Sequence, residues 1–262
     1  MKKFIQKLVN LFGYKVMKIK STNATDLDGL TKYLITKSDP VILDVGAHNG
    51  SSVKRYKKLF KEPEIHCFEP ISDDLNTIKN NYPNDQKLIL NNVGVGDERG
   101  YLKFNINAKR NTSSFKKLIP NTTWIKKRSK TFNVDDDKFS IKEQNTKIIT
   151  LDDYVNEKNL TSIDILKIDT QGFEDKVLLG AQNLLKNNRI KLIQLELIFS
   201  EIYENPLNIY DVEKTLIPNN YKLFGISNGG SLITHYVYQS DLIYISNDTY
   251  ENFKLISPYF NN

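Results

Sequence analysis

Short apolar runs alternate with amphipathic stretches along most of the chain. Strands are predicted for the apolar runs at residues 41–45, 65–68, 87–93, 163–168 and 191–197, and for two closing runs at 221–226 and 241–246. Helical spacing of apolar residues predicts helices at 51–60, 71–82, 151–159, 173–186 and 209–216. Such alternation favours an α/β fold with a mostly parallel sheet, helices on both faces and right-handed crossovers.

The alternation is interrupted between residues 97 and 150. Only two short strands are predicted there, at 101–106 and 147–150, with polar and basic sequence between them. We therefore expect one domain over residues 41–262 that carries an insertion at about 97–150, preceded by a helical extension over residues 1–40. No internal repeat and no interdomain linker is evident.

The N-terminal extension contains a basic amphipathic segment at residues 2–12. Two interpretations stay open: a helix that rests on a membrane surface, and a helix that packs on the domain's own core. Gln6, Lys7 and Asn10 interrupt the continuous apolar core that a signal peptide needs, so a signal peptide is not expected. No apolar run is long enough to cross a bilayer. We expect a cytoplasmic protein, with peripheral contact at the inner face of the membrane as the alternative.

Composition excludes several classes of site. The 262 residues can bury a sizeable core, and hydrophobic content of 39% is that of a globular chain. One cysteine cannot form an internal disulfide, and three histidines make a multi-histidine metal centre improbable, so no metal site is expected. Metal assistance through Asp169 and Glu196 stays open as an alternative. The oligomeric state is left open.

Basic residues gather in the insertion. The chain has a net charge of +6, but residues 101–134 hold nine Lys and Arg side chains and no acid. That segment carries +9 and the rest of the chain carries −3. We predict that the insertion contacts an anionic partner and that Lys126, Lys127 and Arg128 take part.

A glycine-containing loop follows the first predicted strand, in Asp44-Val-Gly-Ala-His-Asn-Gly50. Glycines there allow a tight turn close to a ligand, and Asp44 suits a ligand that bears a cation. Glu69 follows the second strand, where a carboxylate can accept both hydroxyls of a ribose. The loop lacks the three-glycine dinucleotide fingerprint. A plain tight turn is the alternative.

The third strand ends at a flexible edge that contains Gly94, Gly96 and Asp97. An adenine ring can lie beside such an edge, and Asp97 can accept its exocyclic amine. In the other interpretation Asp97 only stabilises a turn.

The fourth and fifth strands of the pattern carry the candidate catalytic groups. Strand alternation places Lys167 and Asp169 on one face near the carboxyl edge of the sheet, where ligands of open α/β folds bind. Glu196 can face the same cleft if the two strands are neighbours. A crowded carboxylate suits the general base for an alcohol. A Lys–Asp ion pair with a helix-capping acid remains the alternative.

Together these motifs resemble those of the FkbM-type methyltransferases. The resemblance runs from about residue 41 to residue 196 and includes Phe68-Glu-Pro70 and Leu166-Lys-Ile-Asp-Thr-Gln-Gly-Phe-Glu174. It implies a Rossmann-like class I fold with a final antiparallel strand and S-adenosylmethionine as cofactor. The cofactor residues that it implies are Asp44, Gly46, Asn49, Gly50 and Glu69, with Asp97 and Ser114 nearby. Two residues depart from the family pattern: Gln171 stands where many members have Glu, and His48 where Ala-Asn is usual.

The resemblance implies O-methylation of a hydroxyl on a small molecule or carbohydrate. Asp169 is then the base or orienting group, and Lys167 sets its charge state. Glu196 is the second candidate for the role of Asp169. Basic residues interleaved with Phe104, Phe115, Trp124 and Phe132 leave an RNA methyltransferase open as an alternative, although nucleic acid is not the partner we expect. A further alternative is an inactive binding module that keeps the fold.

Overall fold

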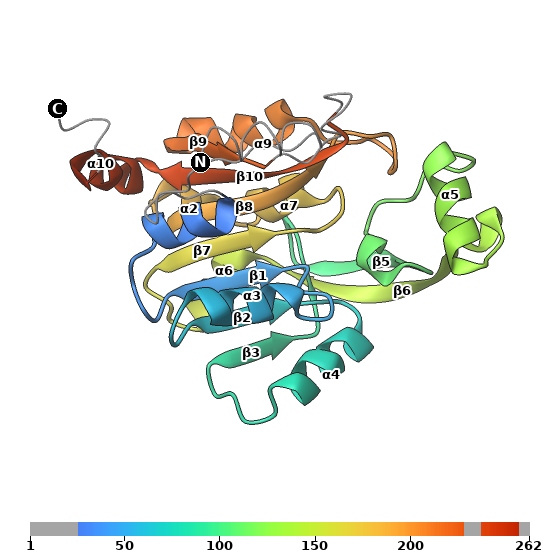
Figure 1. Ribbon diagram of the computed structural model, residues 1–262, viewed down its shortest axis with the longest axis horizontal. Coiled ribbons are helices and arrows are strands. Elements are labelled where there is room, and N and C mark those ends of the chain that lie inside the picture. Colours follow the sequence, from blue (N-terminus) through green and yellow to red (C-terminus); the bar gives the residue numbers. More distant parts are fainter. Residues whose placement is uncertain (1–25, 228–236, 257–262) are drawn as a thin grey trace, which may run out of the picture.

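Seven strands form the central sheet of the computed structural model, which describes residues 26–227 and 237–256 (Figure 1). In spatial order they are β3 (Leu88–Asn91), β2 (Glu64–Phe68), β1 (Val41–Val45), β7 (Ile163–Ile168), β8 (Ile190–Ile198), β10 (Gln239–Ser246) and β9 (Tyr221–Ile226). Neighbours from β3 to β8 are parallel, and β10 is antiparallel to both β8 and β9. The predicted mostly parallel sheet with a final antiparallel strand is confirmed.

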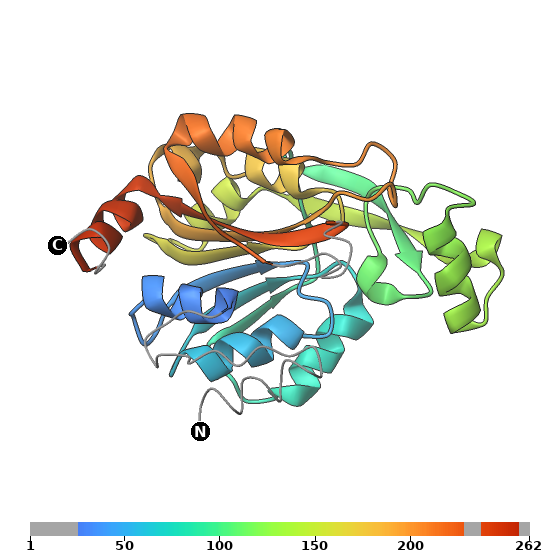
Figure 2. The same cartoon turned by 45° about the horizontal axis from the view of Figure 1, so that its top comes forward.

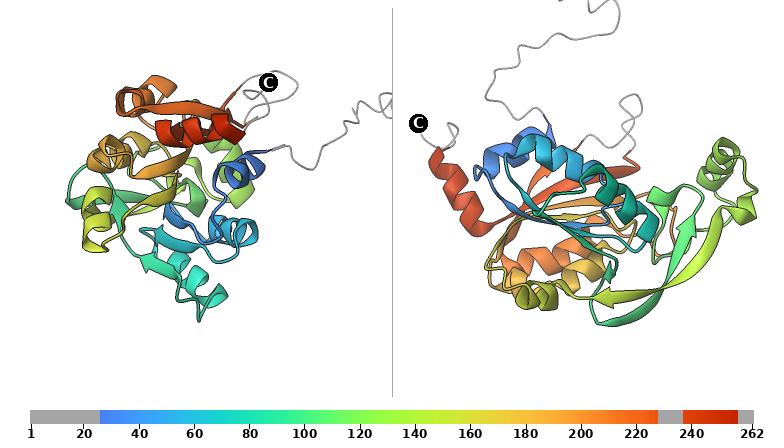
Figure 3. Two further views of the ribbon diagram at one scale, coloured as in Figure 1. Left: turned by 90° about the vertical axis from the view of Figure 1, so that its left-hand side faces the viewer. Right: turned by 90° about the horizontal axis from the view of Figure 1, so that it is seen from below.

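Helices cover both faces of this sheet, as predicted (Figure 3). One face packs against α2 (Leu27–Leu34), α3 (Ser51–Leu59) and α4 (Ser72–Asn81). The other packs against α6 (Leu151–Glu157), α7 (Glu174–Leu179), α8 (Gln182–Lys186) and α9 (Ile209–Leu216). The chain closes with α10 (Asn247–Ile256), which contacts β8, β9 and β10. Both faces of the central strands are therefore dry, which explains their continuous apolar sequence.

The end of the N-terminal extension packs on the domain. Asp26 caps α2 by accepting a hydrogen bond from the Gly29 backbone N–H at 2.7 Å. Leu27 and Leu30 lie against Gly225 of β9 and join the core on that face. The amphipathic segment at residues 2–12 lies outside the described residues. None of the helices described is long and apolar enough to cross a membrane.

The insertion forms a second sheet that extends from the carboxyl edge of the first (Figures 1 and 2). Its strands are β4 (Gly94–Val95), β6 (Ser140–Ile149) and β5 (Gly100–Asn107), in that spatial order. A helix, α5 (Thr123–Phe132), lies at its far end, with one-turn 3-10 helices at Arg110–Thr112 and Asp136–Lys138, and a third elsewhere at Ile217–Asn219. The sequence predicted neither α5 nor the first half of β6.

The expected single helix over residues 173–186 is wrong, because α7 and α8 are separate. The break falls at Gly180, where a Cβ would lie 1.9 Å from the Gly96 carbonyl oxygen. The Gly180 carbonyl accepts the Asp152 backbone N–H at 2.9 Å instead of continuing a helix. The turn thus packs against the residue that follows β4 and against the start of α6.

Candidate active site

A loop at the carboxyl end of β1 forms one wall of the site. Gly46 has a φ of +81° and donates its N–H to the Phe68 carbonyl at 3.0 Å. A Cβ at Gly46 would lie 1.9 Å from the Asp169 carbonyl oxygen, so only glycine lets the end of β1 approach β7 this closely. Gly50 caps α3 with a φ of +85°. The predicted tight turn is confirmed, and it lies where the strand order reverses, the usual ligand crevice of open α/β sheets.

Glu69 lies beside this loop at the end of β2. Its side chain is buried, and its two oxygens accept the backbone N–H groups of His48 at 3.0 Å and Ile71 at 2.8 Å. Burial raises the pKa of Glu69 to about 7, and the two backbone N–H groups limit that rise. Each oxygen keeps a second lone pair, so the carboxylate is fixed in place and can still accept ligand hydroxyls.

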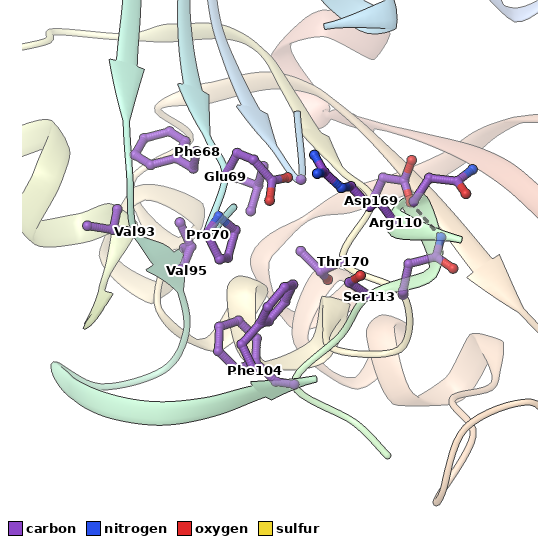
Figure 4. Close-up of a pocket in the computed structure, with 16 residues that line it drawn as sticks. Phe68, Glu69, Pro70, Val93, Val95, Phe104, Arg110, Ser113, Asp169 and Thr170 are labelled. Atoms are coloured by element: carbon purple, nitrogen blue, oxygen red, sulfur yellow. Dashed lines mark hydrogen bonds between the residues drawn. The ribbon is translucent and has the colours of Figure 1, made fainter. Parts of the chain in front are cut away.

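A narrow apolar slot extends from Glu69 toward the second sheet (Figure 4). Phe104 and Phe115 pack edge to face there, with ring centroids 4.8 Å apart. Besides these rings, the slot is lined by Phe68, Pro70, Val93, Gly94, Val95, Arg110 and Ser113. Flat apolar walls that end at an anchored carboxylate fit an adenosine, with the base in the slot and the ribose at Glu69.

Lys167 contacts three groups beneath the loop. Its Nζ lies 3.2 Å from Asp44 Oδ1 and 3.4 Å from Asp169 Oδ2, and it donates to the Gly46 carbonyl at 3.3 Å. Burial alone would lower the pKa of Lys167, but the carboxylates of Asp44 and Asp169 outweigh it and raise that pKa above its ordinary value. Lys167 therefore stays charged and stabilises the negative charge of Asp169.

Gln171 connects the two candidate catalytic carboxylates. Its Nε2 donates to Asp169 Oδ1 at 2.9 Å and to Glu196 Oε2 at 3.0 Å. Its backbone has a φ of +58°, and Tyr203 Oη lies 3.0 Å from its Oε1. Glu174 holds the turn from inside by accepting N–H groups of Thr170 at 2.9 Å and of Gly172 at 3.0 Å. Gln171 thus fixes the positions of Asp169 and Glu196.

Acidic groups concentrate on this side of the site. Glu196 also accepts Gln239 Nε2 at 2.9 Å, and Asp241 stands directly opposite it on β10. Burial, together with the charges of Asp169 and Asp241, raises the pKa of Glu196 to about 8. Burial and Asp169 likewise raise the pKa of Asp241. Near neutral pH, Glu196 therefore holds a proton in a large fraction of molecules.

A second, wider pocket of about 610 Å³ opens next to the slot. Slot and pocket share Gly46, Asn111, Asp169 and Gln171, so the two spaces meet at Asp169. From the sheet, Lys167, Glu196 and Asp241 also line the pocket, and the insertion contributes Lys109, Thr112, Trp124 and Arg128. One ligand in the slot and another in the pocket would thus meet at the Asp169 carboxylate.

The structure places several predicted cofactor residues away from both spaces. Asp44 is fully buried under the loop, bonded to Ser52 and Lys167, so it shapes the loop from below. The Asn49 side chain is exposed and lines neither space. Asp44 therefore supports the loop from below, and neither side chain lines the slot or the pocket.

Two more predicted positions need correction. Asp97 pairs with Lys176 Nζ at 2.6 Å and lies outside the slot, which supports its interpretation as a turn residue. Ser114 is buried and donates to the Gln171 carbonyl at 2.8 Å, so it supports the turn behind the site. Its neighbour Ser113 lines the slot instead. Alternating side-chain direction in an extended segment accounts for the shift by one residue.

Sequence reasoning missed the pocket residues that come from the insertion and from β10, namely Lys109, Asn111, Trp124 and Asp241. The first three lie in a segment without periodic pattern, and Asp241 faces Glu196 only because β10 inserts between β8 and β9. Over the described ranges, no group of three or more His, Cys, Asp and Glu side chains is placed to hold a metal ion.

The family model of the methyltransferase FkbM domain matches residues 44–248, which span the loop, Glu69, Asp169 and both pocket walls. The chain belongs to the FkbM methyltransferase family. It is 27% identical over 184 residues to the 2-O-methyltransferase NoeI of Sinorhizobium fredii, a match that covers 66% of this chain and 70% of that protein.

Solved methyltransferases resemble this FkbM protein weakly. A TehB-like SAM-dependent methyltransferase from Corynebacterium glutamicum is 9% identical with a TM-score of 0.43, over 94% of this chain and 97% of that one. Fibrillarin from Aeropyrum pernix, solved with natively bound S-adenosyl-L-methionine, is 9% identical with a TM-score of 0.39, over 80% of this chain and 67% of that one.

The cofactor of this FkbM methyltransferase is S-adenosylmethionine. The residues present fit it. The apolar slot and the anchored Glu69 suit its adenosine, and the acids around Asp169 suit its positively charged sulfonium. The methionine part would then follow the loop from Gly46 to Gly50 toward the wider pocket.

Proposed function

We propose that this enzyme transfers a methyl group to a hydroxyl of a small-molecule or carbohydrate acceptor. One observation carries the proposal: the Asp169 carboxylate lies where the cofactor slot meets a pocket large enough for a sugar-sized ligand. The name of the relative from Sinorhizobium fredii, a 2-O-methyltransferase, supports transfer to oxygen. A cytoplasmic location fits the single cysteine, which is the buried and unpaired Cys67.

S-adenosylmethionine supplies an electrophilic methyl group on its sulfonium. The chain's own residues orient and deprotonate the acceptor. Asp169 accepts the hydrogen bond of the acceptor hydroxyl and takes its proton as the oxygen attacks. Lys167 stabilises the carboxylate, and Gln171 holds it in one orientation through the 2.9 Å hydrogen bond to Oδ1. Much of the rate enhancement would come from this alignment.

Glu196 has a supporting role in this proposal. Because its pKa is raised to about 8, the protonated form is favoured at neutral pH and can donate a hydrogen bond to the acceptor. A neutral Glu196 also leaves Asp169 as the main negative charge at the junction.

The proposal is tested by incubating the enzyme with methyl-labelled S-adenosylmethionine and a panel of nucleotide sugars, lipid-linked glycans and RNA. We expect label in a saccharide product and none in RNA. Label only in RNA would support the alternative of an RNA methyltransferase. Cofactor binding by calorimetry without transfer to any acceptor would favour an inactive binding module.

A further inference from the structure

The part of the wide pocket that the insertion lines carries two basic side chains. Lys109 follows β5, and Arg128 lies on α5. Neither forms an ion pair with a carboxylate in the part of the chain that the structure describes, whereas Arg110, next in sequence to Lys109, pairs with Asp73 and Asp74. The insertion therefore forms a basic side of the pocket, whereas the sheet and α3 contribute acids together with Lys167 and Arg55.

The two cations are close enough to repel each other. Burial lowers the pKa of Lys109, and the charge of Arg128 lowers it further. An anion placed between them would relieve this repulsion and gain charge-assisted hydrogen bonds from both. The charge of Glu196 acts on Lys109 in the opposite direction, but among the described residues no carboxylate forms an ion pair with Lys109 or Arg128.

The basic side is held in place by packing. Ile125 and Ser129 of α5 are buried, and Trp124 packs edge to face on Phe139 with ring centroids 5.7 Å apart. The Arg128 guanidinium lies over the Trp124 ring, 5.8 Å from its centroid. Trp124 itself lines the pocket, where its apolar ring can pack on the C–H face of a sugar.

We propose that Lys109, Arg128 and Trp124 form an acceptor subsite for a saccharide that carries a phosphate or carboxylate group. This inference rests on the proposed function, because it orients the acceptor. The anionic group lies at Lys109 and Arg128, the sugar ring lies on Trp124, and the hydroxyl to be methylated points to Asp169. The earlier expectation for Lys126 and Lys127 changes: both are exposed and neither lines the pocket.

The chain contains a single tryptophan, so Trp124 fluorescence reports directly on this subsite. The protein, saturated with S-adenosylhomocysteine, is titrated with glucose, glucose 6-phosphate and glucuronate. We expect the two anionic sugars to change the emission at concentrations at least about tenfold lower than glucose, since a charge-assisted contact contributes about 1.5–3 kcal/mol. Tighter binding of the phosphate or of the carboxylate identifies which anion the subsite prefers.

A matched pair of double variants tests the residues. Lys109→Ala/Arg128→Ala should weaken binding of the anionic sugars at least about tenfold and abolish the preference over glucose. Lys126→Ala/Lys127→Ala removes the same charge and should leave both affinities unchanged. Equal affinity for glucose and the anionic sugars, or equal loss in both double variants, would overturn the proposal.

Calorimetry with S-adenosylhomocysteine distinguishes a failure of the proposed anion subsite from a failure of the proposed methyl transfer. Both double variants should bind it as the wild type does, which shows that the fold and the cofactor slot are intact. Wild-type protein that binds the cofactor and methylates a neutral glycan, without preferring anionic sugars, would refute the anion subsite and leave the proposed function standing. Absence of methyl transfer to any hydroxyl would refute the proposed function itself.

Discussion

Asp169 is held from two sides at the junction of the two spaces. Lys167 neutralises one oxygen, and Gln171 donates to the other while it also donates to Glu196. A glutamate at this position would add a fourth acid beside Asp169, Glu196 and Asp241. The amide of Gln171 instead donates to both Asp169 and Glu196, so it holds the two carboxyl groups without adding charge.

Asp169→Asn tests the base directly. The amide is nearly isosteric but cannot take a proton, so we expect the methylation rate to fall by about 10²–10⁴-fold with little change in S-adenosylhomocysteine affinity. Single-turnover kinetics and calorimetry measure the two quantities. Asp135→Asn, at an exposed acid of the insertion that pairs with Lys138, serves as the control. Near-normal turnover in Asp169→Asn would remove Asp169 from the mechanism.

The raised pKa of Glu196 predicts a specific pH dependence of the free energy of unfolding. Its pKa is raised from 4.5 to about 8 in the folded chain, so between these values the folded protein holds a proton that the unfolded chain loses. The contribution of Glu196 to the free energy of unfolding therefore has its full value below about pH 4.5. It is lost as the pH rises from there through 8. Relative to Glu196→Gln, the wild type should lose up to about 1.4 kcal/mol per pH unit in this window.

Urea unfolding at a series of pH values measures this difference. Glu201→Gln, at an exposed glutamate that lines neither space, should give a curve parallel to that of the wild type. If the free energies of unfolding of wild type and Glu196→Gln stay parallel from pH 5 to 8, Glu196 is not held protonated by its surroundings.

Elements that repeat a simple pattern could be predicted from the sequence, and the others could not. The strands at 41–45 and 163–168 are buried on both faces, so their apolar runs are unambiguous, and both agree with the structure. The first half of β6 is exposed and polar, and its strand form depends on pairing with β5, which the sequence does not show. In α5 the mixture of basic residues and few apolar ones conceals the helical period.

In the site, too, some residues could be predicted from the sequence pattern and others could not. Lys167, Asp169 and Glu196 follow from strand alternation and lie together as expected, and Gly46 and Glu69 follow from their places at strand ends. Trp124 reaches the pocket because it packs against Ile198, Ile202 and Tyr203 at and beyond the end of β8, a contact that the sequence does not show. The aromatic residues that left RNA open also pack together, since Phe104 and Phe115 contact each other and line the slot.

The loop after β1 can be tested as an element through Gly46→Ala. The new Cβ would meet the Asp169 carbonyl at 1.9 Å in a left-handed backbone, so both the loop and the end of β7 must move. We expect a loss of stability of more than about 1–2 kcal/mol and a marked loss of S-adenosylhomocysteine affinity.

Gly225→Ala is the comparison for this variant. Its φ lies outside the left-handed region, and the new Cβ would meet only leucine and isoleucine side chains, at 2.7 Å and beyond. It should cost less stability and leave cofactor affinity unchanged. Thermal unfolding and calorimetry give both values, and a Gly46→Ala protein with wild-type affinity would show that the loop geometry is not needed for binding.

At the scale of the whole molecule, the basic residues of the insertion can be grouped by what surrounds their side chains. Lys103 and Arg110 pair with acids, Lys126 and Lys127 are exposed, and Lys109 and Arg128 face the pocket. The net charge of +6 therefore says little about the partner. Lys109 and Arg128 of the insertion line the same pocket as Asp169, so the proposed acceptor has its anion at the insertion and its hydroxyl at Asp169.

The most direct test of methyl transfer to oxygen is the position of the methyl group in the product. The enzyme is incubated with S-adenosylmethionine labelled with ¹³C in its methyl group and an anionic saccharide acceptor, and the product is analysed by NMR. We predict a single methyl ether on a saccharide hydroxyl, absent from the Asp169→Asn reaction. A methyl group on nitrogen or carbon, or an ether formed equally well by Asp169→Asn, would contradict the proposed mechanism.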